Sequence, residues 1–333
     1  MLTVESLTLP ALREAFAADG YVCGDEIIVP VYVSIALGKP LLVEGQPGVG
    51  KTEIAKVLSR VFDAPLVRLQ CYEGLDENKA LYEWNYQKQL LRIQAWGAGA
   101  GRPRDGEAGG GSGSSGRSGD LDGAPGSTAV PAVSDLEAEV FSEEFLLERP
   151  LLRALRSRRR AVLLIDEIDR TDDEFEAFLF EILSEFQVTI PELGTVVARH
   201  TPMVVLTSNR SRELSDALKR RCLLLYIDFP DAEKELRILR NKVPGLREEL
   251  ARQVVLAVRQ VRANERVRKK PSVAESIDWA RTLVALNWTE LDGEALARTL
   301  NVILKHKDDL ELYADPAEAD ALRLAAHGEP PAP

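Results

Sequence analysis

The chain has 333 residues, of which 45% are hydrophobic and 29% are charged, and its net charge is −11. This composition predicts a globular protein that is long enough for two domains and buries a large core. The acidic balance argues against the basic surface that a typical nucleic-acid-binding protein presents, at the level of the whole chain.

Short runs rich in β-forming residues alternate with helical patterns over the first 230 residues. The runs cover residues 41–44, 66–70, 161–165, 203–207 and 223–228. Such alternation predicts an α/β fold in which helices cover a parallel sheet. The clearest helix follows the third run, because the apolar residues from Phe175 to Phe186 recur on one helical face. The segment "VTIPELGTVV" (188–197) is typical of a β-hairpin that turns at residues 191–194.

Residues 97–134 carry 12 of the 23 glycines and few side chains that can be buried, which predicts a disordered insert within the first domain. After Pro230 the β pattern stops. Helices are expected over 231–242, 246–264, 272–286 and 292–310, and Ser272 and Glu275 have the spacing of a capping box. We therefore expect a core domain over 1–230, a small all-helical domain over 231–312, and an extension over 313–333 that is flexible from about residue 327.

The segment "GQPGVGKT" fits the pattern G-x-x-x-x-G-K-[ST] and lies between a predicted strand and a predicted helix. Its glycines let successive main-chain N–H groups converge on phosphate oxygens, and the helix N-terminus favours negative charge. Lys51 is expected to bridge the β- and γ-phosphates of ATP, and the Thr52 hydroxyl to hold Mg²⁺. The expected nucleotide-binding residues of this loop are Gly45, Gln46, Pro47, Gly48, Val49, Gly50, Lys51, Thr52 and Glu53.

Two later strands end in residues that complete such a site. Asp166 ends the buried run in "AVLLIDEIDR" and is expected to reach the Thr52-bound Mg²⁺ through water. Glu167 follows it and can orient and deprotonate a water molecule, so the pair favours hydrolysis over transfer to an acceptor. Asn209, at the end of "MVVLTSN", is expected to orient that water or to sense the γ-phosphate. Asp169 is expected to cap the next helix or to lie on the surface.

In this order, the loop, "LLIDEID", Asn209 and "LSDALKRRC" before a last strand resemble the AAA+ ATPases, in which a helical lid follows an αβ core. Within these, the chain is similar to the MoxR group and most similar to its CoxD-type members. The segments that carry this narrower resemblance are "GYVCGDEIIVP", "YEWNYQKQLLRIQ", "FSEEFLLERPLLRAL" and "RRCLLLYIDFP". The resemblance covers nearly the whole chain, apart from the 97–134 insert and the tail.

The resemblance implies roles for further residues. Tyr21 and Val22 would line the adenine pocket, and Asn209 would be sensor 1. Arg220 or Arg221, with Arg221 preferred, would be the arginine finger that reaches the γ-phosphate held by the neighbouring subunit of a hexameric ring.

Sensor 2 stays unassigned, because the first turn after Ser272 has no arginine. Arg281 lies about two turns further along the helix, at a distance from the nucleotide that leaves its role open. The resemblance further implies that the hairpin over 188–197 faces the ring pore. The alternative is that it only extends the edge of the sheet.

The resemblance also implies a biological role. Family members of this type are chaperone-like remodelling ATPases that work with a partner bearing a von Willebrand factor A domain. A CoxD-type member would mature a client metalloenzyme such as a molybdenum hydroxylase related to carbon monoxide dehydrogenase.

Three alternatives remain for the use of ATP, and the residues weigh against each. Glu167 and the arginine finger argue against an ATP-switched binding scaffold with little turnover, and Glu167 suits water better than the acceptor of a kinase. The acidic balance and the lack of aromatic residues among basic ones argue against a nucleic-acid motor.

The three cysteines are far apart and form no CxxC pair, which indicates a reducing compartment. The N-terminus lacks the basic segment of a signal peptide, and the apolar runs fall far short of the roughly 20 residues that a membrane span needs. We therefore expect a cytoplasmic protein.

Overall fold

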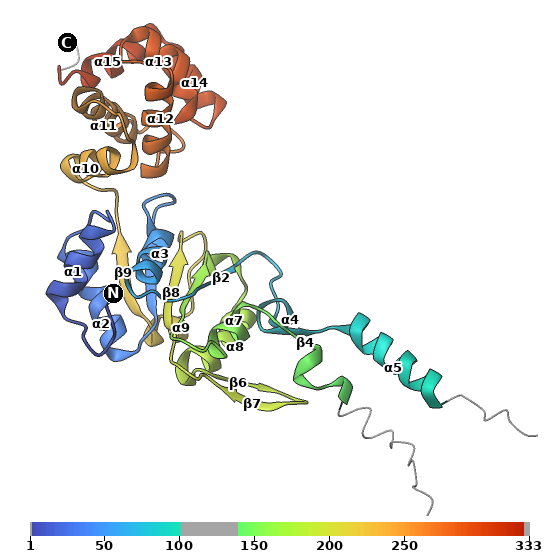
Figure 1. The fold of residues 1–333 in the computed structure, drawn as a ribbon. Helices are drawn as coiled ribbons and strands as arrows, with labels where there is room; N and C mark the ends of the chain where they lie inside the picture. The colour runs from blue at the N-terminus through green and yellow to red at the C-terminus, as the bar shows by residue number, and fades with distance from the viewer. Residues whose placement is uncertain (1, 101–138, 330–333) are drawn as a thin grey trace, which may run out of the picture.

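A five-stranded parallel sheet is the centre of the computed structural model, which describes residues 2–100 and 139–329. Its order is β2-β5-β8-β1-β9, and every neighbouring pair of strands is parallel. The strands are β1 (Leu41–Gly45), β2 (Leu66–Gln70), β5 (Val162–Asp166), β8 (Met203–Ser208) and β9 (Leu223–Ile227). Figure 1 shows helices beside this sheet and a second group of helices beyond the tip of β9. The predicted fold class, a parallel-sheet αβα core followed by a helical region, is confirmed.

The central strands β1, β5 and β8 are buried on both faces, because helices cover the two sides to which successive side chains point. Leu41 and Val43 pack against helices α1 (Leu9–Ala18), α2 (Asp25–Leu37) and α3 (Lys51–Val61). Leu42 belongs to the cluster on the opposite face. That cluster includes helices α7 (Pro150–Leu155), α8 (Asp173–Glu185) and α9 (Asp216–Arg221). The helix predicted from Phe175 onward is α8, which buries Phe175 on its apolar face.

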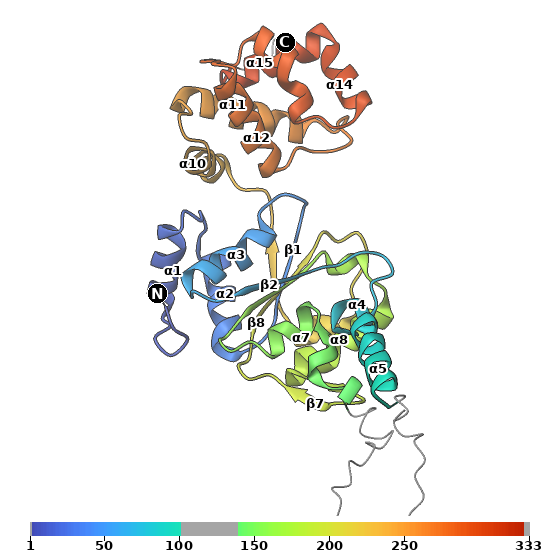
Figure 2. The ribbon, with the colours of Figure 1, turned by 45° about the vertical axis from the view of Figure 1, so that its right-hand side comes forward.

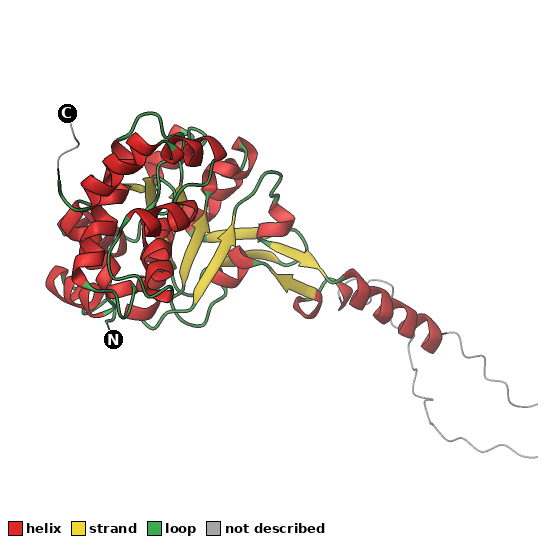
Figure 3. Ribbon diagram, turned by 90° about the horizontal axis from the view of Figure 1, so that it is seen from above, coloured by secondary structure: helices red, strands yellow, loops and turns green. Residues whose placement is uncertain are grey.

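Between β2 and β5 the chain forms a small unit that projects from the core. It contains α4 (Glu77–Ala80), β3 (Tyr82–Trp84), α5 (Tyr86–Ala100), the 3₁₀ helix η1 (Glu143–Phe145) and β4 (Leu146–Glu148). Strands β3 and β4 pair antiparallel, and Figure 3 shows α5 extending away from the rest of the molecule.

Helix α5 corrects the predicted start of the disordered insert. The backbone is helical through residue 100, so the expectation of a loop over 97–100 is wrong. Once a helix has formed, each further residue adds a hydrogen bond, which offsets the cost of roughly 1 kcal/mol that a helical glycine carries. The remainder of the predicted insert, residues 101–134, lies outside the described residues.

The predicted hairpin is formed by β6 (Gln187–Ile190) and β7 (Gly194–Val197), which pair antiparallel. Within the described residues these two strands are a sheet of their own, so the alternative that the hairpin extends the edge of the main sheet is wrong. Val188 and Ile190 bury their side chains in the cluster that contains α8. This packing holds the hairpin against the helical layer and not beside a strand.

The chain after β9 is helical. Its elements are α10 (Ala232–Lys242), α11 (Glu248–Ala263), α12 (Val273–Ala285), α13 (Gly293–Thr299), η3 (Leu300–Val302), α14 (Lys307–Ala314) and α15 (Pro316–Ala326). Figure 2 shows this helical region joined to the sheet through α10. The capping box of Ser272 and Glu275 is present at the start of α12. Across residues 2–100 and 139–329, none of the helices has the length and apolarity of a membrane span.

The single helix expected over 292–310 is wrong, because the chain leaves the helix after η3. The break allows the buried Asp309 carboxylate to accept hydrogen bonds from the N–H groups of Arg268 and Lys269. Tyr313 and Leu322 pack in the same cluster as α11 and α12, so they continue the helical region beyond residue 312. Residues 330–333 of the expected flexible tail lie outside the described residues.

A buried ion pair joins three helices of this region. Arg262 on α11 donates to both carboxylate oxygens of Glu235 on α10, at 2.7 and 2.9 Å, and to the carbonyl oxygen of Pro271 at 2.7 Å. Ser276 on α12 donates to the same carboxylate at 2.8 Å. The Glu235 side chain is 0% exposed, so its charge depends on these donors.

We predict that Arg262→Met lowers the free energy of unfolding by about 3–5 kcal/mol, because it leaves the Glu235 charge buried without its partner. The matched control is Arg298→Met, which removes an exposed ion pair with Glu294 and is expected to cost less than about 0.5 kcal/mol. Urea unfolding followed by circular dichroism measures both. Equal, small losses in the two variants would contradict the assignment.

Candidate nucleotide-binding site

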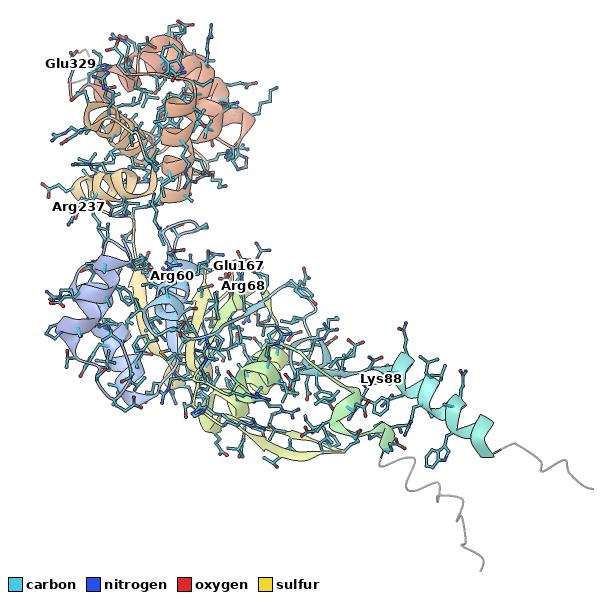
Figure 4. The ribbon with its side chains drawn as sticks, in the orientation of Figure 1. Arg60, Arg68, Lys88, Glu167, Arg237 and Glu329 are labelled. Atoms are coloured by element: carbon cyan, nitrogen blue, oxygen red, sulfur yellow. The ribbon has the colours of Figure 1, made fainter. Side chains whose placement is uncertain are left out.

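The predicted site residues of three strands meet at one edge of the sheet. Lys51 and Thr52 begin α3 shortly after β1, Asp166 ends β5, and Asn209 follows β8. Because these strands are parallel, their carboxyl ends share an edge. Figure 4 shows the labelled Glu167 side chain at this edge, on the side of the sheet that faces the helical region.

The glycine-rich loop, residues 45–50, turns where other residues do not fit. A Cβ atom on Gly45 would lie 2.1 Å from the carbonyl oxygen of Ile227, and one on Gly48 would lie 2.5 Å from the Ser272 side chain. Gly48 also has a φ of +74°, a left-handed conformation that glycine adopts without strain. The loop is therefore a tight turn between β1 and α3, and Gln46 and Pro47 are exposed at its tip.

Lys51 lies under this loop and is only 6% exposed. Its ammonium group donates to the carbonyl oxygens of Gly45 and Gln46 and to the Asn209 side-chain oxygen, each at 2.8 Å. Burial holds the pKa of Lys51 below its usual value, although the nearby carboxylates of the site act to raise it. All three hydrogen-bond acceptors are neutral oxygens, so the ammonium group is oriented without a direct ion pair and is suited to meet an anion.

Asp166 is 3% exposed and receives hydrogen bonds on both carboxylate oxygens. Its Oδ1 accepts from the hydroxyls of Thr52, at 3.0 Å, and of Thr207, at 2.6 Å. Its Oδ2 accepts from Arg68 Nε at 3.1 Å and from Arg68 Nη2 at 2.6 Å. Thr52 and Asp166, the residues predicted to serve the metal, are thus in direct contact.

Glu167 is held in a fixed orientation. Its φ of 59° is a left-handed conformation that is uncommon outside glycine, and its N–H donates to the Thr207 hydroxyl at 2.9 Å. Its Oε1 accepts from the Asn209 side-chain amide at 3.3 Å. Its Oε2 accepts from Gln70 at 3.2 Å and pairs with Arg170 at 3.0 Å. Asn209 therefore bridges Lys51 and Glu167.

Asp169 is buried beneath the segment that carries Asn209. The expectation that it caps a helix or lies on the surface is therefore wrong. It is 3% exposed and accepts from the N–H groups of Asn209 and Ser211, at 3.2 and 2.9 Å. Burial acts to raise the pKa of Asp169, but the hydrogen bonds from Ser211 and Asn209 outweigh it and hold the pKa below its usual value. Asp169 fixes the turn that carries Asn209.

A cavity of about 540 Å³ adjoins the loop, between the core and the helical region. Its volume suits a ligand of nucleotide size. An N–H group of α12, that of Ala274, donates to the carbonyl oxygen of Gly48 at 3.3 Å and joins the two regions beside it. The lining includes Tyr21, Val22, Gly48, Val49, Gly50 and Glu53 of the core, and Lys234, Lys242, Ala274, Asp278 and Arg281 of the helical region. Arg281 therefore faces the cavity, although the sequence left its reach open.

The two arginines predicted as the finger lie elsewhere. They precede β9, whose first residue, Leu223, pairs with Leu41 at the start of β1, so they lie at the amino end of the sheet. Arg221 donates to the Ser184 hydroxyl at 2.6 Å and lies over the Phe180 ring at 4.8 Å. The structure brings Lys51, Asp166, Glu167 and Asn209 together and leaves Arg220 and Arg221 apart from them.

The donor set fits a magnesium ion better than a metal with an all-protein ligand cage. In the described part of the chain, no group of three or more His, Cys, Asp or Glu side chains is placed to hold a metal. Magnesium is usually bound by one or two carboxylates together with substrate phosphates and waters. The Thr52 hydroxyl beside the Asp166 carboxylate, at the foot of a phosphate-type loop, has that composition.

Three polar residues of the site, Arg68, Gln70 and Thr207, were not predicted from the sequence. Arg68 and Gln70 lie on β2 and contact Asp166 and Glu167, and Thr207 contacts both acids. A signal was present in "LVRLQ", where buried and exposed residues alternate and the exposed face carries Arg68 and Gln70. Strand alternation identifies that face, but only the pairing of β2 with β5 brings it to the acids.

The fold and this site together define a P-loop NTPase with the AAA+ arrangement of a parallel-sheet core followed by helices. The model of the ATPase family associated with various cellular activities (AAA) matches residues 41–230, which is more than half of the chain. The chain belongs to this family, and it is an ATPase. The match begins at β1 and ends just before α10.

Individual relatives share less with the chain. Over 68 residues it is 34% identical to the uncharacterized protein YojN of Bacillus subtilis (strain 168), a stretch that is 20% of this chain and 22% of YojN. The chain thus spans about a fifth of this curated relative. It is similar to the Thermotoga maritima RuvB Holliday junction branch migration motor, with 16% identity, a TM-score of 0.43, and 96% of this chain and 80% of that chain covered. A point mutant of that RuvB has 13% identity, a TM-score of 0.46, and coverages of 98% and 85%.

Proposed function

We propose that the chain hydrolyses ATP at this site, with Mg²⁺, and that Lys51, Asp166, Glu167 and Asn209 act directly on the phosphates, the metal or the attacking water. The observation that carries the proposal is the continuous set of contacts from Lys51 to Asn209 and from Asn209 to Glu167. It links the group that would hold the γ-phosphate to the group that would activate water. Beside it, Thr52 and Asp166 form the metal-holding pair.

The substrate fits along the edge of the sheet. The adenosine would occupy the 540 Å³ cavity next to Tyr21 and Val22, and the phosphates would follow the glycine-rich loop to Lys51. When bound by Thr52 and Asp166, Mg²⁺ supplies positive charge that offsets the charge of the β- and γ-phosphates. Glu167 accepts the proton of the attacking water. Asn209 orients that water and the Lys51 ammonium group relative to each other.

The arginine finger requires a second copy of the chain. Arg220 and Arg221 lie at the opposite end of the sheet from Lys51, so they are remote from the nucleotide of their own subunit. Arg221 is exposed and held by Ser184. A ring, hexameric in the usual arrangement of the resembled family, would bring Arg221 to the γ-phosphate of the next subunit.

The resemblance to the MoxR group, and most of all to CoxD-type members, suggests how the energy is used. We infer a remodelling ATPase that works with a von Willebrand factor A domain protein on a client metalloenzyme of the molybdenum hydroxylase type. The proposed location is the cytoplasm, and the proposed domain division is a core over residues 1–230 followed by a helical lid. We infer that the hairpin β6-β7, which is a sheet of its own, faces the pore of the ring, as the resemblance implies.

We predict that Lys51→Ala weakens ATP binding by about a hundredfold, because a charge-assisted contact to phosphate is lost. Glu167→Gln is expected to keep binding and to lower turnover by about a hundredfold or more, because glutamine accepts no proton. Isothermal titration measures binding, and phosphate release measures turnover. The control Glu174→Gln makes the same change on an exposed turn of α8 and should behave as the parent. Parental turnover in Glu167→Gln would remove Glu167 from the mechanism.

We predict that Arg221→Ala lowers turnover by about 10³-fold or more while the nucleotide still binds. Mixing Arg221→Ala subunits with Glu167→Gln subunits should restore part of the activity, because some interfaces then combine an intact finger with an intact base. Phosphate release is measured across a range of mixing ratios. Failure to recover activity at every ratio would contradict a site shared between subunits.

We predict that Glu167→Gln protein held on ATP retains its partner and client together. Affinity purification from the native cell, followed by mass spectrometry, is expected to recover a von Willebrand factor A domain protein and a metalloenzyme. The Lys51→Ala variant is the control, because its affinity for the nucleotide is expected to be about a hundredfold lower. Equal recovery of the same proteins with both variants would contradict an ATP-dependent remodelling role.

A further inference from the structure

The guanidinium group of Arg68 occupies one side of the carboxylate that is proposed to serve the metal. Arg68 lies on the edge strand β2, and both Nε and Nη2 donate to Asp166 Oδ2, at 3.1 and 2.6 Å. Figure 4 labels the Arg68 and Glu167 side chains, both at the carboxyl edge of the sheet. Arg68 takes no part in the mechanism described above.

The hydrogen-bonding capacity of Asp166 is fully used in this arrangement. An ionised carboxylate offers about four lone-pair sites. Oδ1 accepts from Thr52 and Thr207, and Oδ2 accepts twice from Arg68. A water molecule on a bound metal would need one of these sites, so one donor has to leave.

Arg68 is the donor that can leave. The Thr207 hydroxyl is buried and also accepts from the Glu167 N–H at 2.9 Å, and Thr52 is itself a proposed metal ligand. The Arg68 side chain is 52% exposed, whereas that of Asp166 is 5% exposed. Arg68 can therefore swing into solvent without breaking the packing of the sheet.

We propose that Arg68 and the divalent cation compete for Asp166. In the metal-free enzyme Arg68 is the cation that contacts the Asp166 carboxylate directly, and this ion pair stabilises a charge that is only 5% exposed. Entry of the magnesium nucleotide displaces the guanidinium group, because metal-bound water needs a lone-pair site that Arg68 occupies and the two positive charges repel each other. The inference rests on the proposed function, since it assumes that the site binds a metal nucleotide.

The competition is measurable as the effect of Mg²⁺ on nucleotide affinity. The probe is a fluorescent, non-hydrolysable ATP analogue, titrated into the full chain with Mg²⁺ and with a chelator. The quantity compared is the ratio of the metal-free Kd to the Mg²⁺-bound Kd. In Arg68→Gln the metal-free Kd should rise, because Asp166 then repels the phosphates, and the Mg²⁺-bound Kd should fall. The ratio is expected to increase about tenfold, as the loss of one charge-assisted contact allows.

Arg170→Gln is the matched control. It removes the same charge from an arginine that pairs with Glu167 and not with Asp166, so the ratio should stay within about twofold of the parent. Arg68→Lys keeps the charge and loses the two-pronged contact, and its ratio should lie between those of the parent and Arg68→Gln. This variant also tests the inference if Arg68→Gln fails to fold.

Two results would overturn the inference. An unchanged ratio in the Arg68 variants, with the analogue still bound, would exclude competition and leave the proposed function intact. If both Kd values had risen by the same factor, Arg68 would instead contact the phosphates directly. A parent protein that binds the analogue in neither buffer would overturn the proposed function together with this inference.

Discussion

The hydrogen bond between the Thr52 hydroxyl and Asp166 Oδ1, 3.0 Å long, is the contact on which the site depends. It joins α3, the helix that follows β1, to the end of β5. In the sheet, strand β8 lies between β1 and β5. Thr207 on β8 fills the space between them, and Asn209 beyond it reaches both Lys51 and Glu167. A parallel sheet is what allows residues far apart in the sequence to meet in this way, because all its strands end at one edge.

The helical region closes the same edge without an arginine in the first turn of α12. The Ala274 N–H donates to the carbonyl oxygen of Gly48, so the glycine-rich loop and α12 are in direct contact. The buried pair of Arg262 and Glu235 fixes α12 to α10 and α11. The glycine-rich loop is therefore connected to the helical region through the main chain, and Arg281 lines the cavity beside this contact.

Much of this was predictable from the sequence, because the informative patterns are local. "GQPGVGKT" identifies Lys51 without knowledge of the fold, and a buried run that ends in Asp166 requires only the rule for parallel sheets. The role of Arg68 was not predictable, since it depends on the pairing of β2 with β5 over a long sequence separation. The break in the helix before Asp309 was not predicted for a related reason: the apolar spacing continues past residue 300, and Asp309 meets the N–H groups of Arg268 and Lys269 only in the folded chain.

The central claim is that Lys51 and Asp166 act on one metal-bound nucleotide. Crystals grown with Mn²⁺ and a non-hydrolysable ATP analogue test it directly, because the anomalous scattering of manganese locates the metal. We expect one peak beside Thr52 Oγ1, within one water molecule of Asp166, with the γ-phosphate against Lys51. A metal peak away from Thr52, or a triphosphate bound without contact to Lys51, would contradict it.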